Sequence, residues 1–383
     1  MNYKIKMPSS VYGGSDSIQI LSGIVKQRKI ENVLLFTDPG VHTCGVLKPA
    51  TDVLDKCGVS YRVIDHVVPE PTADDVQSVL DETSDMKCDL ILAVGGGSTM
   101  DTAKLVSVLR NSEYGVRDLL KDSSPAAKKV YTVMVPTTCG TGSEATCNAI
   151  VAVPEEKLKV GIVSDEMIPD AVILDPAMIA GLPPKIIASS GIDALAHCVE
   201  CYTSNKANHF SDVFALAGAK LIFGNIERAY AEPDDIQAKN NMLIGAFYGG
   251  VAITSSGTTA VHALSYPLGG AYHIAHGVSN AILFAPVMKH NMSACADRLA
   301  AICDAIEPAF SKRSETERSG RVIDRISEIV AFTKIPKSLK SFGVPASDLD
   351  FLVDSGSKVT RLLNNNRKKL SLEEIREIYQ EVL

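Results

Sequence analysis

The chain has 383 residues and a formal net charge of -7, with 46% hydrophobic and 22% charged residues. This length can bury a sizeable core and favours two domains over one. The absence of a long basic run argues against a nucleic acid or an anionic membrane as partner. The nine cysteines are an odd number and scattered, which favours reduced thiols in the cytoplasm over disulfides. The N-terminal residues lack the apolar stretch of a secretory signal, and no apolar segment is long enough to span a membrane.

The first half of the sequence alternates short apolar runs with amphipathic segments. Helical periodicity is found, for example, at 73–84 and 100–109. Strands that alternate with helices predict a mostly parallel sheet with helices on its faces. The expected strands are 33–37, 61–64, 89–94, 131–135, 149–153 and 160–163, with a last strand that ends at Leu174.

The second half of the sequence has a different residue pattern, which begins after Pro183 and Pro184. Ala, Leu, Ile and His recur at helical spacing with few β-branched runs. The last helix opens with Ser371 and Glu374, which have the spacing of a capping box. The sequence therefore predicts an α/β domain over residues 1–184 and an all-helical domain over residues 185–383.

A glycine-rich turn follows one of the expected strands. Gly95, Gly96 and Gly97 precede Ser98 and open a helix that includes Asp101. Glycines let the backbone approach a ligand closely, and the N-terminus of a helix offers free N–H groups to phosphate. The turn is therefore a candidate pyrophosphate cradle in a Rossmann-like domain, and a plain strand–helix turn is the alternative.

Two further segments suggest a dinucleotide, although the glycine spacing is not that of G-x-G-x-x-G. Asp38 follows the expected strand 33–37, where its carboxylate could bind a ribose 2′-OH and disfavour NADP, or simply form a turn. A loop with hydroxyls and glycines follows the strand 131–135, at the strand end where α/β sheets bind ligands. The candidate cofactor residues of this loop are Thr137, Thr138, Thr141 and Ser143.

A carboxylate and several histidines form a candidate metal site. Asp193 and His197 are four residues apart in a helical segment, so both project from one face. His262, His273 and His276 follow later in the chain. One carboxylate with imidazoles is a ligand set for Fe²⁺ or Zn²⁺. A structural Asp–His hydrogen bond is the alternative, although unpaired polar groups among Ala, Leu and Ile would be costly.

Together these motifs resemble the iron-containing (group III) alcohol dehydrogenases over nearly the whole chain. The resemblance implies an active site in a cleft between a dinucleotide-binding domain and a helical domain. It also implies a metal, with Fe²⁺ first and Zn²⁺ compatible, that acts as a Lewis acid on the substrate oxygen while hydride passes to or from NAD(H). By position, it assigns the metal to Asp193, His197, His262 and His276, the pyrophosphate to Gly96, Gly97 and Ser98, and other cofactor contacts to Thr137, Thr138, Asp38 and Lys159.

Two departures from the family pattern bear on catalysis. Where the family usually shows H-A-x-A-H-P-L-G, this chain has Tyr266 in place of the second histidine, which is often credited with proton transfer. His273 stands where many members carry Asp or Asn, so His273 and Tyr266 could relay the substrate proton, or only line the pocket. Residues 253–261 are rich in hydroxyls, which would favour a polar substrate if they face it, but could equally satisfy helix backbone.

The sequence therefore predicts an NAD-dependent, metal-containing alcohol dehydrogenase or aldehyde reductase for a small, polar-substituted primary alcohol or aldehyde. A glycerol-type polyol dehydrogenase of the same architecture is one alternative. A metal-dependent hydrolase or lyase is another, but it would leave the glycine turn and Asp38 without a role. The expected partner is a small molecule, with no nucleic acid and no membrane, and the resemblance suggests a homodimer or larger homo-oligomer.

Overall fold

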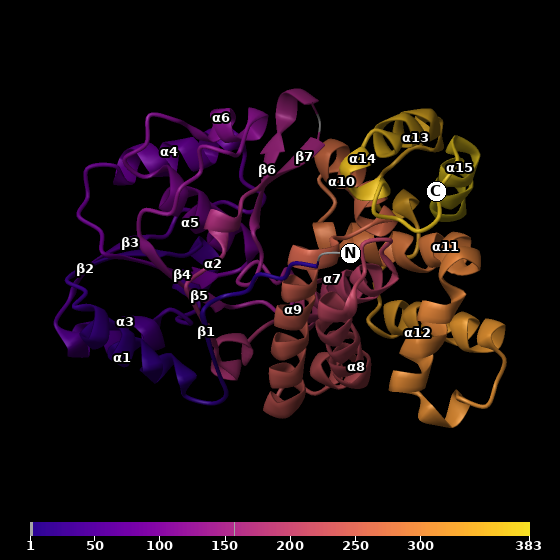
Figure 1. Cartoon of the computed structure of the whole chain (residues 1–383), viewed down its shortest axis with the longest axis horizontal. Coiled ribbons are helices and arrows are strands. Elements are labelled where there is room, and N and C mark those ends of the chain that lie inside the picture. The colour runs from indigo at the N-terminus through magenta and orange to yellow at the C-terminus, as the bar shows by residue number, and fades with distance from the viewer. Residues whose placement is uncertain (1–2, 157) are drawn as a thin grey trace. The chain divides into compact units, whose positions relative to one another are not determined.

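The computed structural model describes residues 3–156 and 158–383, and the chain divides into two compact units. One unit is Lys6–Leu182, and the other joins Pro183–Leu383 to the N-terminal residues as far as Ile5. The first unit is α/β and the second is built from helices (Figure 1). The predicted fold class is therefore confirmed, whereas the grouping of the N-terminal residues with the helices was not anticipated.

The α/β unit is built on a parallel sheet. Its strands are β1 (Ser10–Gly13), β2 (Asn32–Phe36), β3 (Ser60–Ile64), β4 (Leu90–Gly95), β5 (Tyr131–Pro136) and β8 (Ala171–Leu174). They lie in the order β1-β8-β5-β4-β2-β3, and every neighbouring pair is parallel. The strands β6 (Asn148–Val153) and β7 (Leu158–Val163) form a separate antiparallel pair.

Helices cover both faces of this sheet (Figure 1). They are α1 (Ile20–Arg28), α2 (Pro39–Thr43), α3 (Lys48–Cys57), α4 (Ala73–Thr83), α5 (Gly97–Leu109) and α6 (Val116–Lys121). Leu34 and Phe36 belong to the core on the side of α4, α5 and α6, whereas Val33 and Leu35 belong to the core on the side of α1 and α3. Successive strand residues point to opposite faces, and burial of both faces explains why the strands appear as continuous apolar runs.

The strand order changes direction beside β2. From β2 the chain continues to β3 at the edge of the sheet, and then returns to β4 on the other side of β2. Open α/β sheets bind ligands beyond the carboxyl ends of the strands at such a switch point. Asp38 follows β2 and Gly96 follows β4, so the topology leads both candidate cofactor segments to this place.

The strands expected from the sequence are all present, with ends within a few residues of those predicted. Only β1 was missed, because its four residues, Ser-Val-Tyr-Gly, are half exposed and too few to show a pattern. It pairs with β8 in register from Ser10 to Gly13. A strand this short is defined by its pairing with a neighbouring strand, and its own sequence is too short to predict it.

The helical unit contains the second half of the chain. Its helices are α7 (Pro184–Thr203), α8 (His209–Ala231), α9 (Ile236–Ser256), α10 (Ala260–Tyr272), α11 (His276–Ile306), α12 (Glu315–Phe332), α13 (Leu349–Ser357), α14 (Thr360–Leu363) and α15 (Leu372–Val382). Helix α7 packs against α8, α9 and α11, which surrounds it with apolar side chains. The capping box of Ser371 and Glu374 at the start of α15 is confirmed.

None of the helices in the described part of the chain is long and apolar enough to cross a membrane.

Candidate metal centre and cofactor loops

Four predicted metal ligands come together around one carboxylate oxygen. Asp193 and His197 lie one turn apart on α7, His262 lies in the first turn of α10, and His276 is the first residue of α11. The Oδ1 atom of Asp193 is 3.9 Å from Nε2 of His197. It is 3.5 Å from Nε2 of His262 and 3.6 Å from Nε2 of His276. Helices that are distant in sequence thus direct one carboxylate and three imidazoles to one point.

The spacing of these groups fits a bound divalent metal. Tetrahedral ligands with bonds of about 2.1 Å stand about 3.4 Å apart, close to the measured Asp–His distances. Ligand atoms of Asp193, His262 and His276 all lie within 4.8 Å of one another. His197 adjoins this group because its ring stacks on that of His262, with centroids 4.6 Å apart. The mixed oxygen and nitrogen donor set suits Fe²⁺ or Zn²⁺.

The close grouping of these residues alters their protonation. Burial alone would raise the pKa of Asp193, but the neighbouring imidazoles outweigh it, so the pKa of this carboxyl lies far below its usual range. Burial would likewise lower the pKa of His262, but the carboxylates of Glu200 and Asp193 raise it to about 9. A metal that binds Nε2 of His262 therefore has to displace a proton, which makes metal binding dependent on pH.

Glu200 is a residue of this centre that the sequence prediction missed. It lies on α7 three residues after His197 and is fully buried. It accepts hydrogen bonds from Oγ1 of Thr259 at 2.6 Å and from the backbone N of Val261 at 2.7 Å. It also contacts Nδ1 of His262. An acceptor at Nδ1 keeps the proton there and directs the Nε2 lone pair to a metal. Because Glu200 is three residues after His197, the two side chains lie on the same face of α7. That spacing could have identified Glu200 from the sequence.

Gly277 explains how the start of α11 reaches α7. A Cβ atom added to this glycine would lie 2.1 Å from the backbone oxygen of Ser189. Any other residue would therefore push α11 away from α7. Because His276 directly precedes Gly277, the same displacement would carry its imidazole away from Asp193.

Tyr266 and His273, the predicted proton relay, occupy different environments. Tyr266 is buried on α10, and its ring centroid is 6.1 Å from that of His276. Burial raises the pKa of its phenol. His273 is the exposed C-cap of α10 and has a left-handed backbone, with φ of 54°. The structure thus brings Tyr266 beside the candidate metal ligands.

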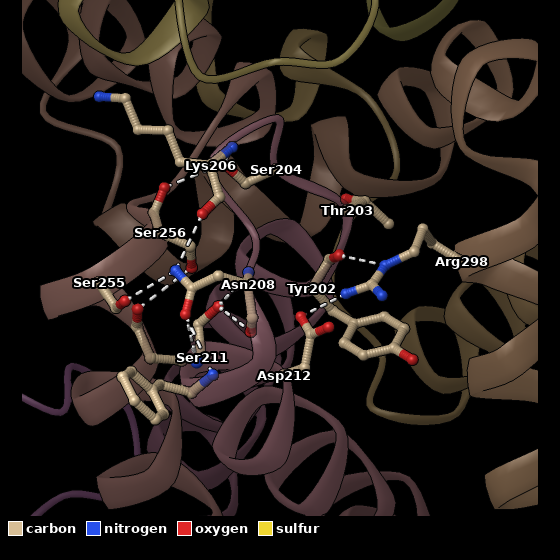
Figure 2. Close-up of polar contacts among 12 residues, drawn as sticks. Tyr202, Thr203, Ser204, Lys206, Asn208, Ser211, Asp212, Ser255, Ser256 and Arg298 are labelled. Carbon is tan, nitrogen blue, oxygen red and sulfur yellow. Dashed lines mark hydrogen bonds and ion pairs between the residues drawn. The ribbon is translucent and has the colours of Figure 1, made fainter. Parts of the chain in front are cut away.

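Three hydroxyls within residues 253–261 form hydrogen bonds in the helical unit, as the alternative of satisfied helix backbone predicts. Thr254 and Ser256 donate to backbone oxygens one turn earlier in α9, at 2.8 and 3.1 Å. Ser255 accepts a hydrogen bond from Asn208 at 3.0 Å and donates to the backbone of Lys4 at 2.8 Å. Figure 2 shows Ser255 and Ser256 in this network between α9 and the start of α8. These three hydroxyls satisfy helix ends and backbone, and the preference for a polar-substituted substrate stays a prediction.

The two candidate cofactor loops of the α/β unit touch each other. A Cβ atom on Gly97 would lie 2.7 Å from the side chain of Thr141, and one on Gly96 would lie 3.4 Å from Thr138. A Cβ atom on Gly95 would lie 2.5 Å from Thr99 in the same turn. The glycines are therefore required by close packing, and they leave the backbone N–H groups at the start of α5 accessible to a phosphate.

Asp101 and Ser143 hold these loops together through their side chains. Ser143 donates its hydroxyl to Asp101, which also accepts the backbone N–H of Ile150 at 2.9 Å. Lys104 is fully buried 3.0 Å from Asp101, and it donates to the backbone oxygen of Ser143 at 3.0 Å. We therefore expect Asp101 and Ser143 to position the second loop rather than to contact a cofactor directly.

Asp38 and Lys159 have partners within the α/β unit. Asp38 is the N-cap of α2, and its Oδ1 accepts the backbone N–H groups of Gly40 and Val41 at 3.0 Å each. Lys159 is buried in β7 and pairs with Glu70 at 2.6 Å. The backbone N–H of Glu70 in turn donates to Ser98 at 3.0 Å. Lys159 is thus linked through Glu70 to the glycine turn.

A parallel α/β unit with a glycine-rich turn at its switch point, followed by a helical unit with a buried carboxylate and imidazole cluster, is typical of metal-dependent oxidoreductases that use a dinucleotide. Comparison of the sequence with family profiles agrees. Residues 8–176 match the iron-containing alcohol dehydrogenase profile, and residues 187–383 match the C-terminal profile of the Fe-containing alcohol dehydrogenase family. The chain therefore belongs to the iron-containing alcohol dehydrogenase family.

Individual relatives cover the whole chain. Long-chain-alcohol dehydrogenase 1 of Geobacillus thermodenitrificans is 36% identical over 98% of this chain and 96% of its own length. The crystal structure of a 1,3-propanediol oxidoreductase covers all of both chains with a TM-score of 0.95 and 28% identity. That of NADH-dependent butanol dehydrogenase A from Thermotoga maritima has a TM-score of 0.87 and 26% identity, and covers 100% of this chain and 98% of its own. The expected metal-dependent, NAD-linked alcohol dehydrogenase is confirmed as the reaction class.

Proposed function

We propose that this protein interconverts a small primary alcohol and its aldehyde with NAD(H), using one Fe²⁺ ion held by Asp193, His197, His262 and His276. The convergence of three imidazole Nε2 atoms on one buried oxygen of Asp193 carries this proposal. Such a cluster would be costly to bury without a cation to balance it. Zn²⁺ suits the same donors, so the metal requires an experiment of its own.

The protein's own groups prepare this site for the reaction. The bound metal would supply a Lewis acid for the substrate oxygen. Glu200 holds the imidazole of His262 with Nε2 directed to the metal position. The carboxylate of Asp193 would lower the net charge of the loaded site. Both carboxylates are buried, which strengthens their electrostatic effect.

The α/β unit supplies the residues proposed to bind NAD(H). Gly96, Gly97 and Ser98 would hold the pyrophosphate at the N-terminus of α5, with Thr137 and Thr138 on the adjoining loop. Asp38 uses Oδ1 to cap α2, so Oδ2 is the oxygen available to a ribose hydroxyl. A carboxylate at this position would repel a 2′-phosphate and favour NAD(H) over NADP(H).

His273 and Tyr266 are proposed to carry the proton that the reaction exchanges with water. Tyr266 lies beside His276, and His273 is exposed about two turns later, at the end of the same helix α10. A buried phenol near the substrate and an exposed imidazole near the surface are suitable groups for such a relay. Tyr266 stands where the family usually has a histidine, which supports this role.

We also propose a cellular location and an oligomeric state for the protein. All nine cysteines are free thiols, which supports a reducing, cytoplasmic location. A homodimer or larger homo-oligomer is expected from the family resemblance, and the mass of the protein in solution, measured by light scattering, would test it.

The test is NADH oxidation by protein stripped of metal, with Fe²⁺ or Zn²⁺ added back, across a panel of small aldehydes. We expect turnover that depends on metal, and that is highest with Fe²⁺. His276→Ala should abolish it, whereas His290→Ala, on the same helix α11 but outside the cluster, should retain it. Turnover that survives in His276→Ala, or that needs no metal, would contradict the assignment of the site.

A further inference from the structure

Asn280 lies against the candidate metal ligands. It is on α11, one turn after His276, and it is fully buried. Its Nδ2 atom donates a hydrogen bond of 2.7 Å to Oδ1 of Asp193. The same atom lies 3.2 Å from Nε2 of His262 and 3.3 Å from Nε2 of His276. One amide group therefore touches three of the four proposed ligand atoms.

The orientation of this amide is determined by Asp193. The opposite orientation would place the Asn280 carbonyl oxygen against a carboxylate oxygen at hydrogen-bond distance, with two acceptors facing each other. The observed orientation leaves Oδ1 of Asn280 buried and without a hydrogen-bond partner among the described residues. A buried carbonyl without a donor is costly. Asn280 thus forms the hydrogen bond to Asp193 while its own carbonyl oxygen stays without a donor among the described residues.

Asn291 on the same helix shows how an asparagine that serves only stability is arranged. It is also buried, and it exchanges two amide hydrogen bonds with Asn366, each of 2.8 Å. Both ends of that amide are therefore satisfied within the protein. Both ends of the Asn291 amide are hydrogen-bonded, whereas the carbonyl end of the Asn280 amide is not, within the part of the chain that the structure describes. The two residues therefore form a matched pair for experiment.

We propose that Asn280 is a positioning residue of the metal centre. Its amide holds Asp193 so that Oδ1 faces the three imidazoles, which prepares the ligands for a divalent cation. A carboxylate oxygen can accept the N–H of Asn280 with one lone pair and bind a metal with the other. This inference rests on the proposed metal ligands, because it has no meaning if the metal binds elsewhere.

The experiment compares Asn280→Leu with Asn291→Leu in the full-length protein. Leucine has the same branching at Cγ as asparagine, is somewhat larger, and lacks the N–H donor. Each protein is stripped of metal and titrated with Co²⁺, whose visible absorption reports its coordination. The affinity for Zn²⁺ is then measured by competition with a chelator. Circular dichroism and a cooperative melting transition show whether each variant is folded.

We expect Asn280→Leu to bind Zn²⁺ about 10- to 100-fold more weakly, the usual effect of losing a group that orients a ligand. Its Co²⁺ spectrum should also change. Asn291→Leu should lower the melting temperature but leave metal affinity within about a factor of two, as expected for a distant site. If Asn280→Leu fails to fold, Asn280→Ala replaces it with the same expected loss of affinity.

Unchanged metal affinity and an unchanged Co²⁺ spectrum in the Asn280 variant would overturn the inference and leave the proposed function intact. An equal loss of affinity in Asn291→Leu would also overturn it, because general disturbance of α11 would then be the cause. Absence of stoichiometric metal binding in the unsubstituted protein would instead refute the proposed metal ligands, and this inference with them.

Discussion

Glu200 contacts Nδ1 of His262 from within the core of the helical unit. Both residues are buried, and α7 and α10 contribute one each. Two further hydrogen bonds, from Thr259 and the backbone of Val261, fix the Glu200 carboxylate. The imidazole is thus held by a rigid acceptor, so its Nε2 atom is directed to the other ligands with little freedom to rotate. This relationship determines which nitrogen of His262 is available to a metal.

The first prediction concerns this acceptor. Glu200→Gln keeps the shape of the side chain, but its amide can donate to Nδ1 of His262 and move the imidazole proton to Nε2. The metal would then meet an N–H group instead of a lone pair. We expect metal affinity to fall about 10- to 100-fold, measured by chelator competition. Affinity equal to that of the unsubstituted protein would show that Glu200 serves folding alone.

A second prediction tests the proton relay at His273. Because this residue has a left-handed backbone with φ of 54°, the substitution chosen is His273→Asn, since asparagine tolerates that conformation. Loss of a proton-transferring group should lower kcat by about 10²-fold with little change in metal content. His290→Asn is the control for loss of an imidazole. Full turnover of His273→Asn at every pH would mean that His273 only lines the pocket.

The sequence suggested the proposed metal ligands in two ways, through a local pattern and through the family resemblance. Asp193 and His197 share a helix face by spacing alone, whereas His262 and His276 were assigned by the resemblance. The partners Glu200 and Asn280 are less apparent, because their roles depend on how α7, α10 and α11 pack. Long-range packing of this kind leaves no periodic pattern in any one segment.

Residues 253–261 show why a hydroxyl-rich composition alone does not identify a substrate surface. The sequence shows that the segment is polar, but not which way each hydroxyl points. In the structure, Ser255 bonds to Asn208 and to the backbone of Lys4, a residue about 250 positions away in sequence. Serines and threonines at helix ends commonly satisfy backbone groups, and Thr254, Ser255 and Ser256 do so here.

A third prediction separates the two roles of Asp38. Its Oδ1 caps α2, while its charge is proposed to disfavour NADP(H). Asp38→Asn retains an oxygen for the cap and removes the charge. We expect the preference for NADH over NADPH, measured as a ratio of kcat/KM, to fall about tenfold, or about 1.4 kcal/mol. Asp38→Ala should in addition lose about 1 kcal/mol of stability from the missing cap. An unchanged cofactor ratio in both variants would show that the carboxylate does not reach the ribose.

The last prediction concerns Glu144, at the end of the second cofactor loop. This side chain is buried, and burial raises its pKa to about 7. The folded protein therefore holds this proton more strongly than the unfolded chain, in which the pKa is about 4.5. Between these values the folded state binds more protons, so stability falls as the pH rises from about 4.5 to about 7. The total effect is about 3 kcal/mol, at about 1.4 kcal/mol for each pKa unit.

Glu144→Gln is uncharged at every pH, so it should remove this dependence. We expect the variant to match the unsubstituted protein near pH 4.5 and to be more stable at pH 8, measured by urea denaturation. Glu155→Gln is the control, because Glu155 is exposed and hydrogen bonding lowers its pKa. Its contribution has the opposite sign, since it is present at high pH and lost as the pH falls. A Glu144→Gln variant that is less stable at pH 8 would mean that the charged carboxylate is stabilised in the fold, for example by the nearby Lys104, whose charge lowers the pKa of Glu144.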